Sequence, residues 1–114
     1  MHVSLLALAV LAFCNAASAV EISMTITTGG SIAPVVFTSV TGDAGDHHPF
    51  GYFVDGCKVR DNIREVCIDS SRRRAHVIWT NGVRQCLNLT RRDQVQDGRN
   101  HYEYITYTGV GCSW

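Results

Sequence analysis

Long apolar runs are nearly absent from this sequence of 114 residues. The one such run, Val3 to Phe13, is too short to span a bilayer, and no later segment is apolar enough. The run ends at Ala17-Ser18-Ala19, a small-residue pattern that signal peptidase accepts, although no Lys or Arg precedes it. Residues 1–19 are therefore predicted to be a cleaved secretory signal, and residues 20–114 a single secreted, extracellular domain without stable membrane insertion.

Closely spaced cysteine pairs are also lacking. Loss of the signal removes Cys14 and leaves four cysteines with gaps of nine, eighteen and twenty-five residues between them: Cys57, Cys67, Cys86 and Cys112. Without a C-x-x-C pair, this spacing argues against a zinc site, and we predict no metal or cofactor. An even number of cysteines in a small exported chain predicts two disulfides, and all three connectivities remain open. Oxidised thiols also argue against a cysteine nucleophile.

Net charge is zero, because 10 Lys and Arg residues balance 10 Asp and Glu residues. The balance hides a division: residues 20–56 carry four acidic residues and no Lys or Arg, while residues 57–114 carry all ten basic residues and six acidic ones. Lysine is scarce, since nine of the ten basic residues are Arg, which pairs with carboxylates and phosphates and stacks on aromatic rings. The division fits either an anionic partner or pairing between the two halves. The absence of net positive charge argues against membrane disruption.

Helical periodicity is the last notable absence. No long part of residues 20–114 repeats every 3.6 residues, whereas short β-patterned segments alternate with turns. Strands are predicted at 21–28, 35–40, 52–54, 57–59, 75–80, 83–89 and 102–108. Residues 62–68 fit either a further strand or one short helical turn. The pattern predicts an all-β fold, a small antiparallel β-sandwich or barrel of about six strands, stabilised by two disulfides.

Two dipeptides predict tight hairpins. Asn81-Gly82 lies between two strand patterns and is the strongest short-range hairpin signal, because both residues tolerate positive φ. Asp55-Gly56 predicts a second hairpin for the same reason. Residues 41–51 and 90–100 are predicted to be loops from their Gly, Pro and polar content.

Several motifs have a chemical meaning. Asn88-Leu89-Thr90 is an N-glycosylation sequon, so Asn88 is a candidate modification site. The runs Arg72-Arg73-Arg74 and Arg91-Arg92 are either processing sites or charged turns. His47 and His48 could ligate a metal, but adjacent residues in a Gly-rich loop seldom aim at one ion, and we predict none.

One set of side chains could support cleavage of RNA. His76, His101, Glu65 and Glu103 are of the types needed for general acid–base catalysis, with Arg to hold phosphate. The string Ile105 to Gly109 resembles the stretch that carries the catalytic histidine of small secreted fungal ribonucleases, but Tyr107 occupies the histidine place. That resemblance implies either an active ribonuclease or a catalytically dead relative.

A second resemblance concerns the whole pattern. A short signal, about 95 further residues, two expected disulfides and an all-β pattern resemble the small secreted effectors of plant-pathogenic fungi, in particular the six-stranded sandwich (MAX-type) group that includes ToxB-like toxins and blast-fungus avirulence proteins. Val77 to Gln85 is similar to the last hairpin of one such protein. The resemblance implies a non-catalytic protein that binds a host macromolecule, with a host protein favoured over nucleic acid, and it admits uptake into host cells.

The expected binding surface combines unpaired sheet edges with arginine-bearing loops and exposed tyrosines, since Arg and Tyr dominate interface energetics. The candidate residues are Arg72, Arg73, Arg74, Arg91, Arg92, Tyr102, Tyr104 and Tyr107. Three rival functions remain open, namely an antimicrobial or killer toxin, a ribonuclease, and a protease inhibitor acting through loop 41–51.

Overall fold

The computed structural model describes residues 18–30, 32–60 and 62–114. They form one antiparallel sheet of eight strands, so the expected count of about six is corrected to eight, while the all-β class is confirmed. The strands are β1 (Glu21–Gly29), β2 (Ile32–Thr41), β3 (His47–Gly51), β4 (Gly56–Arg60), β5 (Ile63–Asp69), β6 (Arg74–Trp79), β7 (Arg84–Asp97) and β8 (Asn100–Val110), with a 3₁₀ turn, η1 (Ser70–Arg72), before β6.

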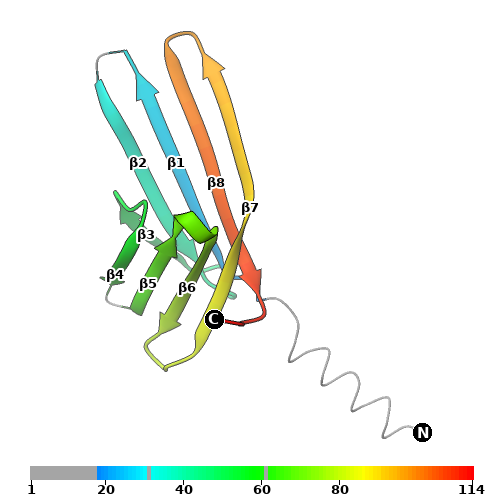
Figure 1. The fold of residues 1–114 in the computed structure, drawn as a ribbon. Helices are drawn as coiled ribbons and strands as arrows, with labels where there is room; N and C mark the ends of the chain where they lie inside the picture. Colours follow the sequence, from blue (N-terminus) through cyan, green and yellow to red (C-terminus); the bar gives the residue numbers. More distant parts are fainter. Residues whose placement is uncertain (1–17, 31, 61) are drawn as a thin grey trace, which may run out of the picture.

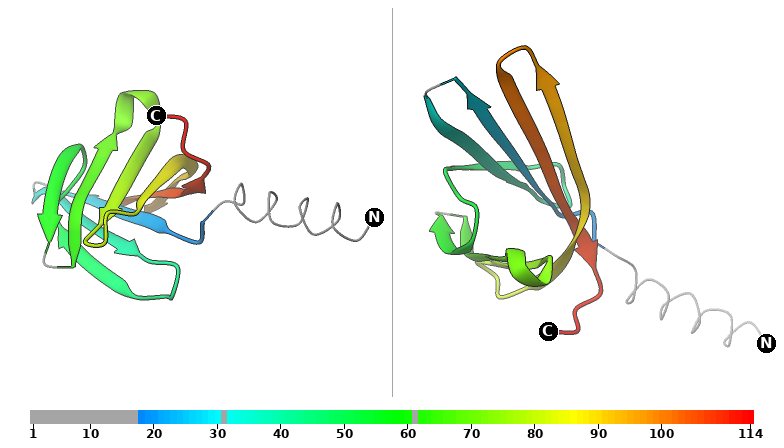
Figure 2. Two further views of the ribbon diagram at one scale, coloured as in Figure 1. Left: turned by 90° about the horizontal axis from the view of Figure 1, so that it is seen from below. Right: turned by 45° about the horizontal axis from the view of Figure 1, so that its top comes forward.

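The sheet curls into a barrel-like body around a single core (Figures 1 and 2). Its strand order is β3-β2-β1-β8-β7-β6-β5-β4, so β3 and β4 are the two edges. These edges meet through side chains, because the Arg60 guanidinium lies 5.5 Å from the centre of the Phe50 ring. The core is built from inward-facing side chains of every strand except β4, including the fully buried Ile22, Val77 and Leu87.

Strands β2, β1, β8 and β7 continue past the barrel as a second, thinner part (upper half of Figure 1). β1 pairs with β8 from Glu21↔Thr108 to Gly29↔Asn100, and β7 and β2 flank this pair. β6 pairs with β7 only as far as Asn88, and β3 pairs with β2 only from Thr38 onward. The outer part of these four strands, residues 25–29, 32–37, 91–97 and 100–104, which we call the blade, therefore has two unpaired edges, and its inner face covers the core only where Val36 and Ile26 pack.

Residue 20 begins the core. The predicted signal lies largely outside the described residues, which start at Ser18. The Val20 side chain is buried, and its carbonyl accepts a hydrogen bond of 3.0 Å from the Gly109 N–H. The predicted boundary at residue 20 would thus leave the packed core intact.

The segments with clear alternation were predicted correctly. Strands occur at the positions expected near 21–28, 35–40, 75–80, 83–89 and 102–108. The turn at Asn81-Gly82 is confirmed: Gly82 has φ 86° and donates a hydrogen bond of 2.9 Å to the Trp79 carbonyl. Of the two alternatives for residues 62–68, the strand is the one found, since β5 (Ile63–Asp69) lies between β4 and β6.

The predicted hairpin at Asp55-Gly56 is wrong. Residues 52–54 form no strand, and β4 pairs instead with β5. Two contacts hold this segment as a crossing between the sheet edges: the Thr38 hydroxyl donates to the Phe53 carbonyl at 2.5 Å, and the Asp55 carboxylate accepts the Ser70 N–H at 3.1 Å. A buried Phe53 side chain fixes the crossing in the core.

Both predicted loops contain strand. β3 occupies residues 47–51, and β7 runs through most of 90–100 as far as Asp97. This half of β7 is exposed at every residue, so no apolar alternation marks it in the sequence. Pairing with β8 imposes the extended conformation, with Thr90 forming a bulge between Leu89 and Arg91.

The structure resolves the disulfide connectivity as Cys57–Cys67 and Cys86–Cys112. The first bond joins directly opposed residues of β4 and β5 on the outside of the barrel. The second ties the tail after β8 to a fully buried cysteine of β7. The two bonds thus constrain one local hairpin and one more distant contact.

We predict that the second disulfide stabilises the fold more than the first. It spans 26 residues rather than 10, and a longer closed loop removes more unfolded-chain entropy, roughly 3.5 against 2.7 kcal/mol. Urea unfolding of Cys86→Ser/Cys112→Ser should give a larger loss of unfolding free energy than that of Cys57→Ser/Cys67→Ser. A larger loss in the Cys57/Cys67 variant would contradict this ranking.

Candidate functional site

The outward face of the blade carries apolar and aromatic side chains from β2, β8 and β7, with Thr25 and Thr27 of β1 between them. The cross-strand rows Val35–Thr27–Tyr102–Val95 and Phe37–Thr25–Tyr104–Asp93 lie two residues apart, so they share one face. Side chains alternate between the two faces of a sheet, and the adjacent row, which contains Met24 and Ile105, faces the core. The first two rows therefore face away from the core. We call the first set the outer blade face.

Several of these side chains are exposed although they are large and apolar. Val35 is 60% exposed, Phe37 53% and Val95 46%. Monomeric proteins seldom leave neighbouring apolar side chains together in solvent without a role in binding. The outer blade face is therefore the strongest candidate for a contact surface.

The two tyrosines of this face stack on each other. The rings of Tyr102 and Tyr104 stack with centroids 6.5 Å apart and an interplanar angle of 14°. The Arg91 guanidinium lies 5.9 Å from the Tyr104 ring centre and pairs with Asp93. Because the charges of Arg91 and Asp93 cancel, this pair adds no net charge to the aromatic surface of the face.

The other predicted binding residues lie elsewhere. Arg92 points to the opposite side of the blade, where it pairs with Glu103 at 2.9 Å. Arg72 and Arg73 are exposed at η1, and Arg74 packs over Trp114 with 5.2 Å between its guanidinium carbon and the ring centre. The five arginines therefore form no common patch.

Tyr107 corrects one expectation. It was expected among the exposed tyrosines, but its side chain is 3% exposed and belongs to the core. It helps to line a cavity of about 210 Å³ at the barrel mouth, together with Met24, Arg92 and Asp55. Burial raises the pKa of the Tyr107 phenol, an effect that the positive charge of Arg92 partly offsets.

The blade edges are protected against strand addition. The outer half of β7 carries Arg91, Arg92 and Asp93, and charged side chains on an edge disfavour pairing with another chain. The outer half of β2 contains Pro34, which cannot donate to a ladder. The face of the blade is thus better suited to binding than its edges.

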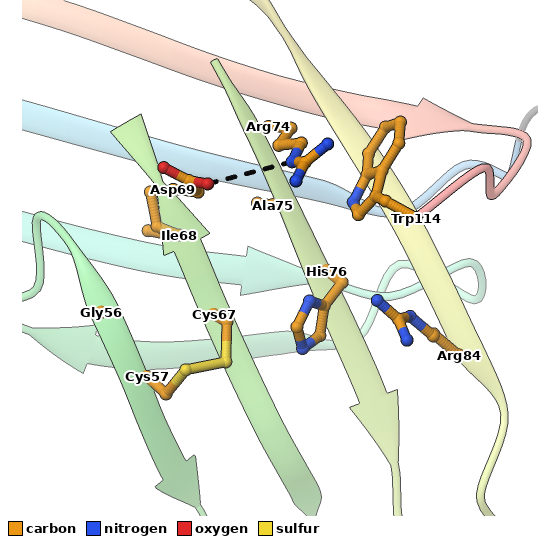
Figure 3. A pocket seen from close by; sticks show the side chains of 10 residues that line it. All are labelled: Gly56, Cys57, Cys67, Ile68, Asp69, Arg74, Ala75, His76, Arg84 and Trp114. Carbon is orange, nitrogen blue, oxygen red and sulfur yellow. Dashed lines mark ion pairs between the residues drawn. A yellow bond between two sulfur atoms is a disulfide. The ribbon is translucent and has the colours of Figure 1, made fainter. Parts of the chain in front are cut away.

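A cleft of about 370 Å³ opens on the outside of β4, β5 and β6 (Figure 3). Its lining comes from four strands and from the C-terminal tail, which the Cys86–Cys112 bond holds nearby. His76 lies there and forms a contact of 3.1 Å with the Glu65 carboxylate, and Arg74 approaches Asp69 at 3.9 Å. Sequence analysis missed this cleft, because only the strand register brings its parts together.

The four candidate acid–base residues do not form one cluster. Glu65 and His76 are in contact, but His101 lies at the end of the blade with Gln96, and Glu103 pairs with Arg92. The β7 partners of the two histidines, Cys86 and Gln96, are ten residues apart, which is roughly 30 Å of strand. A catalytic pair of His76 and His101 is therefore not assembled.

The adjacent residues His47 and His48 lie in different environments. His48 contacts the Asp46 carboxylate at 2.5 Å, and this hydrogen bond lowers the pKa of Asp46. The His48 ring also packs edge-on against Trp79, which gives it a structural role. His47 is exposed.

Asn88 is accessible for modification. Its side chain is exposed on β7 and lies between Arg74 of β6 and Thr108 of β8 in the register. A glycan attached there would extend from the outer wall of the barrel beside the cleft.

No family model, curated protein or solved structure matches the chain. Among residues 18–30, 32–60 and 62–114, no helix is long and apolar enough to cross a membrane.

We predict that ionisation of Tyr107 destabilises the fold at alkaline pH. A phenol whose pKa is raised on folding holds its proton longer in the folded chain, so stability falls as pH rises above the unfolded value of about 10. Tyr107→Phe should lose less unfolding free energy between pH 9 and pH 11 than the parent. Equal losses in both proteins, measured by urea unfolding, would show that the phenol does not contribute.

Proposed function

We propose that this chain is a secreted, non-catalytic effector- or toxin-like protein that binds a host protein through its outer blade face. The observation that carries the proposal is that the exposed Val35, Phe37 and Val95 share one side of the blade with the half-buried Tyr102 and Tyr104. Two disulfides support an oxidising, extracellular setting.

The chemistry of the face favours protein as the partner. Tyrosine, phenylalanine and arginine are enriched at the centres of protein interfaces, where they bury large areas. The single arginine of the face, Arg91, is already paired with Asp93. Nucleic acid binding depends on cations that neutralise phosphates, and this face offers none beyond that pair.

Order in the free protein also supports binding. The Tyr102 and Tyr104 rings stack on each other, and the strands beneath them pair on both sides. Side chains that are held before binding lose less conformational entropy on association. The blade therefore offers a preformed platform rather than a flexible loop.

Substitution of the central aromatic residues should weaken binding. We expect Phe37→Ser/Tyr104→Ser to weaken the complex with the host protein at least thirtyfold, because the loss of even one interface anchor of this kind costs about 2 kcal/mol. The parent protein is first used to capture and identify its partner from plant leaf extract. Affinity of the purified partner is then measured by isothermal titration calorimetry.

The matched control is Val59→Ser, which removes a still more exposed apolar side chain, 72% exposed, from edge strand β4. It should bind like the parent, and circular dichroism should show that both variants retain the fold. A second arm reverses the charge of Arg72 and Arg73 at η1. If Phe37→Ser/Tyr104→Ser binds like the parent, or if only the arginine variant loses affinity, the outer blade face is not the binding surface.

A further inference from the structure

Three cleft residues form a row across neighbouring strands on the outside of the barrel. Cys57 of β4 is opposite Cys67 of β5, and Cys67 is opposite His76 of β6. Figure 3 shows the His76 imidazole beside the disulfide on the same wall. Glu65 precedes Cys67 by two residues on β5 and reaches the same side, since it contacts His76.

These four side chains are the ligand types of a zinc site; three of them already place their ligand atoms close together, and His76 adjoins this group through Glu65. The two sulfurs and a Glu65 carboxylate oxygen all lie within 4.8 Å of one another. The His76 Nε2 atom is 3.1 Å from Glu65 Oε2. Ligand atoms of tetrahedral zinc, at bond lengths near 2.0 Å for nitrogen and oxygen and 2.3 Å for sulfur, are separated by about 3.3 to 3.8 Å.

We propose that reduction of the Cys57–Cys67 disulfide converts this wall into a Zn²⁺ site made of Cys57, Cys67, His76 and Glu65. A thiol reductant of the glutathione class supplies two electrons and two protons, so the protein disulfide becomes two thiols and the reductant becomes a disulfide. Zn²⁺ then replaces the two thiol protons, which are released to water. Two thiolates and an imidazole favour zinc over the hard cations Mg²⁺ and Ca²⁺.

Access favours this bond over the other one. Both cysteines of the first bond are at least partly accessible, since Cys57 is exposed and Cys67 is half-buried, whereas the second bond joins the exposed Cys112 to the fully buried Cys86. Exposed disulfides are generally the more easily reduced. The fold can thus keep the tail anchored while the cleft disulfide opens.

The surrounding charge suits the occupied site. Zn²⁺ with two thiolates, one carboxylate and a neutral imidazole has a net charge of −1. Arg84 lines the same cleft and forms no ion pair within 4.0 Å with any described residue. Its guanidinium is therefore free to offset that charge, and nearby cations also favour thiolates over thiols.

This inference does not depend on the proposed function. Sequence spacing argued against zinc because no two cysteines are near one another along the chain. Strand pairing places two of them, with a histidine, in adjacent positions.

The test uses the secreted, processed product of the full chain. It is reduced with a phosphine under nitrogen, and peptide mapping after alkylation reports which disulfides have opened. Co²⁺ is added as a spectroscopic probe, because thiolate-to-cobalt charge transfer in the near ultraviolet reports sulfur ligation. Zn²⁺ affinity is then measured by competition with a chromophoric chelator.

We expect the reduced protein to bind one Co²⁺ or Zn²⁺ with thiolate bands, and the oxidised protein to bind none. Cys57→Ser/Cys67→Ser should abolish the bands. His76→Ala should weaken Zn²⁺ binding at least tenfold, and Glu65→Gln should weaken it to a smaller extent.

The matched control is His101→Ala, which removes a histidine at the far end of the blade and should bind like the parent. Metal captured by an unfolded reduced chain would be equally sensitive to both histidine changes, and circular dichroism would show the loss of β structure. Equal affinity of His76→Ala and His101→Ala, or no binding by the reduced parent above that of Cys57→Ser/Cys67→Ser, would overturn the proposal.

Discussion

The pairing of β1 with β8 is the interaction on which the rest of the structure depends. It joins residues at opposite ends of the described chain, from Glu21↔Thr108 to Gly29↔Asn100, and thereby joins the β1–β2 hairpin to the β7–β8 hairpin. An isolated two-stranded hairpin is only marginally stable in water. One face of this strand pair supplies Met24 and Ile105 to the core, and the other presents Tyr102 and Tyr104 to solvent. A slip of one residue would exchange these two faces.

The parts of the fold that could be predicted from sequence are those in which one strand face is buried. In β1, Ile22 and Met24 alternate with polar residues, and the Asn81-Gly82 turn is encoded locally by its tolerance of positive φ. The outer half of β7 could not be predicted in this way, because both of its faces are wet and its residues carry no alternation. Asp55-Gly56 misled for the opposite reason: a local turn signal was overridden by long-range contacts of Phe53 and Asp55.

The candidate surfaces were only partly visible in the sequence. Tyr102 and Tyr104 were identified because Tyr is concentrated in that segment, but their neighbours Val35 and Phe37 come from a strand more than sixty residues away. Tyr107 has the parity of the core row, and its burial follows from its pairing with Ile22 and Leu89. The cleft is likewise a product of register, since its disulfide, His76 and Trp114 are distant along the chain. Strand register, which sequence alone does not specify, decides which of these side chains meet.

The central claim is that the blade is an ordered four-stranded platform rather than two independent flexible hairpins. Cross-strand nuclear Overhauser effects in the free, oxidised protein test it most directly, at the pairs Thr25–Tyr104 and Thr27–Tyr102 between β1 and β8. We expect backbone contacts at both pairs, with β1 and β8 amides protected from hydrogen exchange out to the ends of these strands. Contacts that stop at Met24–Ile105, with rapid exchange beyond, would contradict it and remove the basis for a preformed binding face.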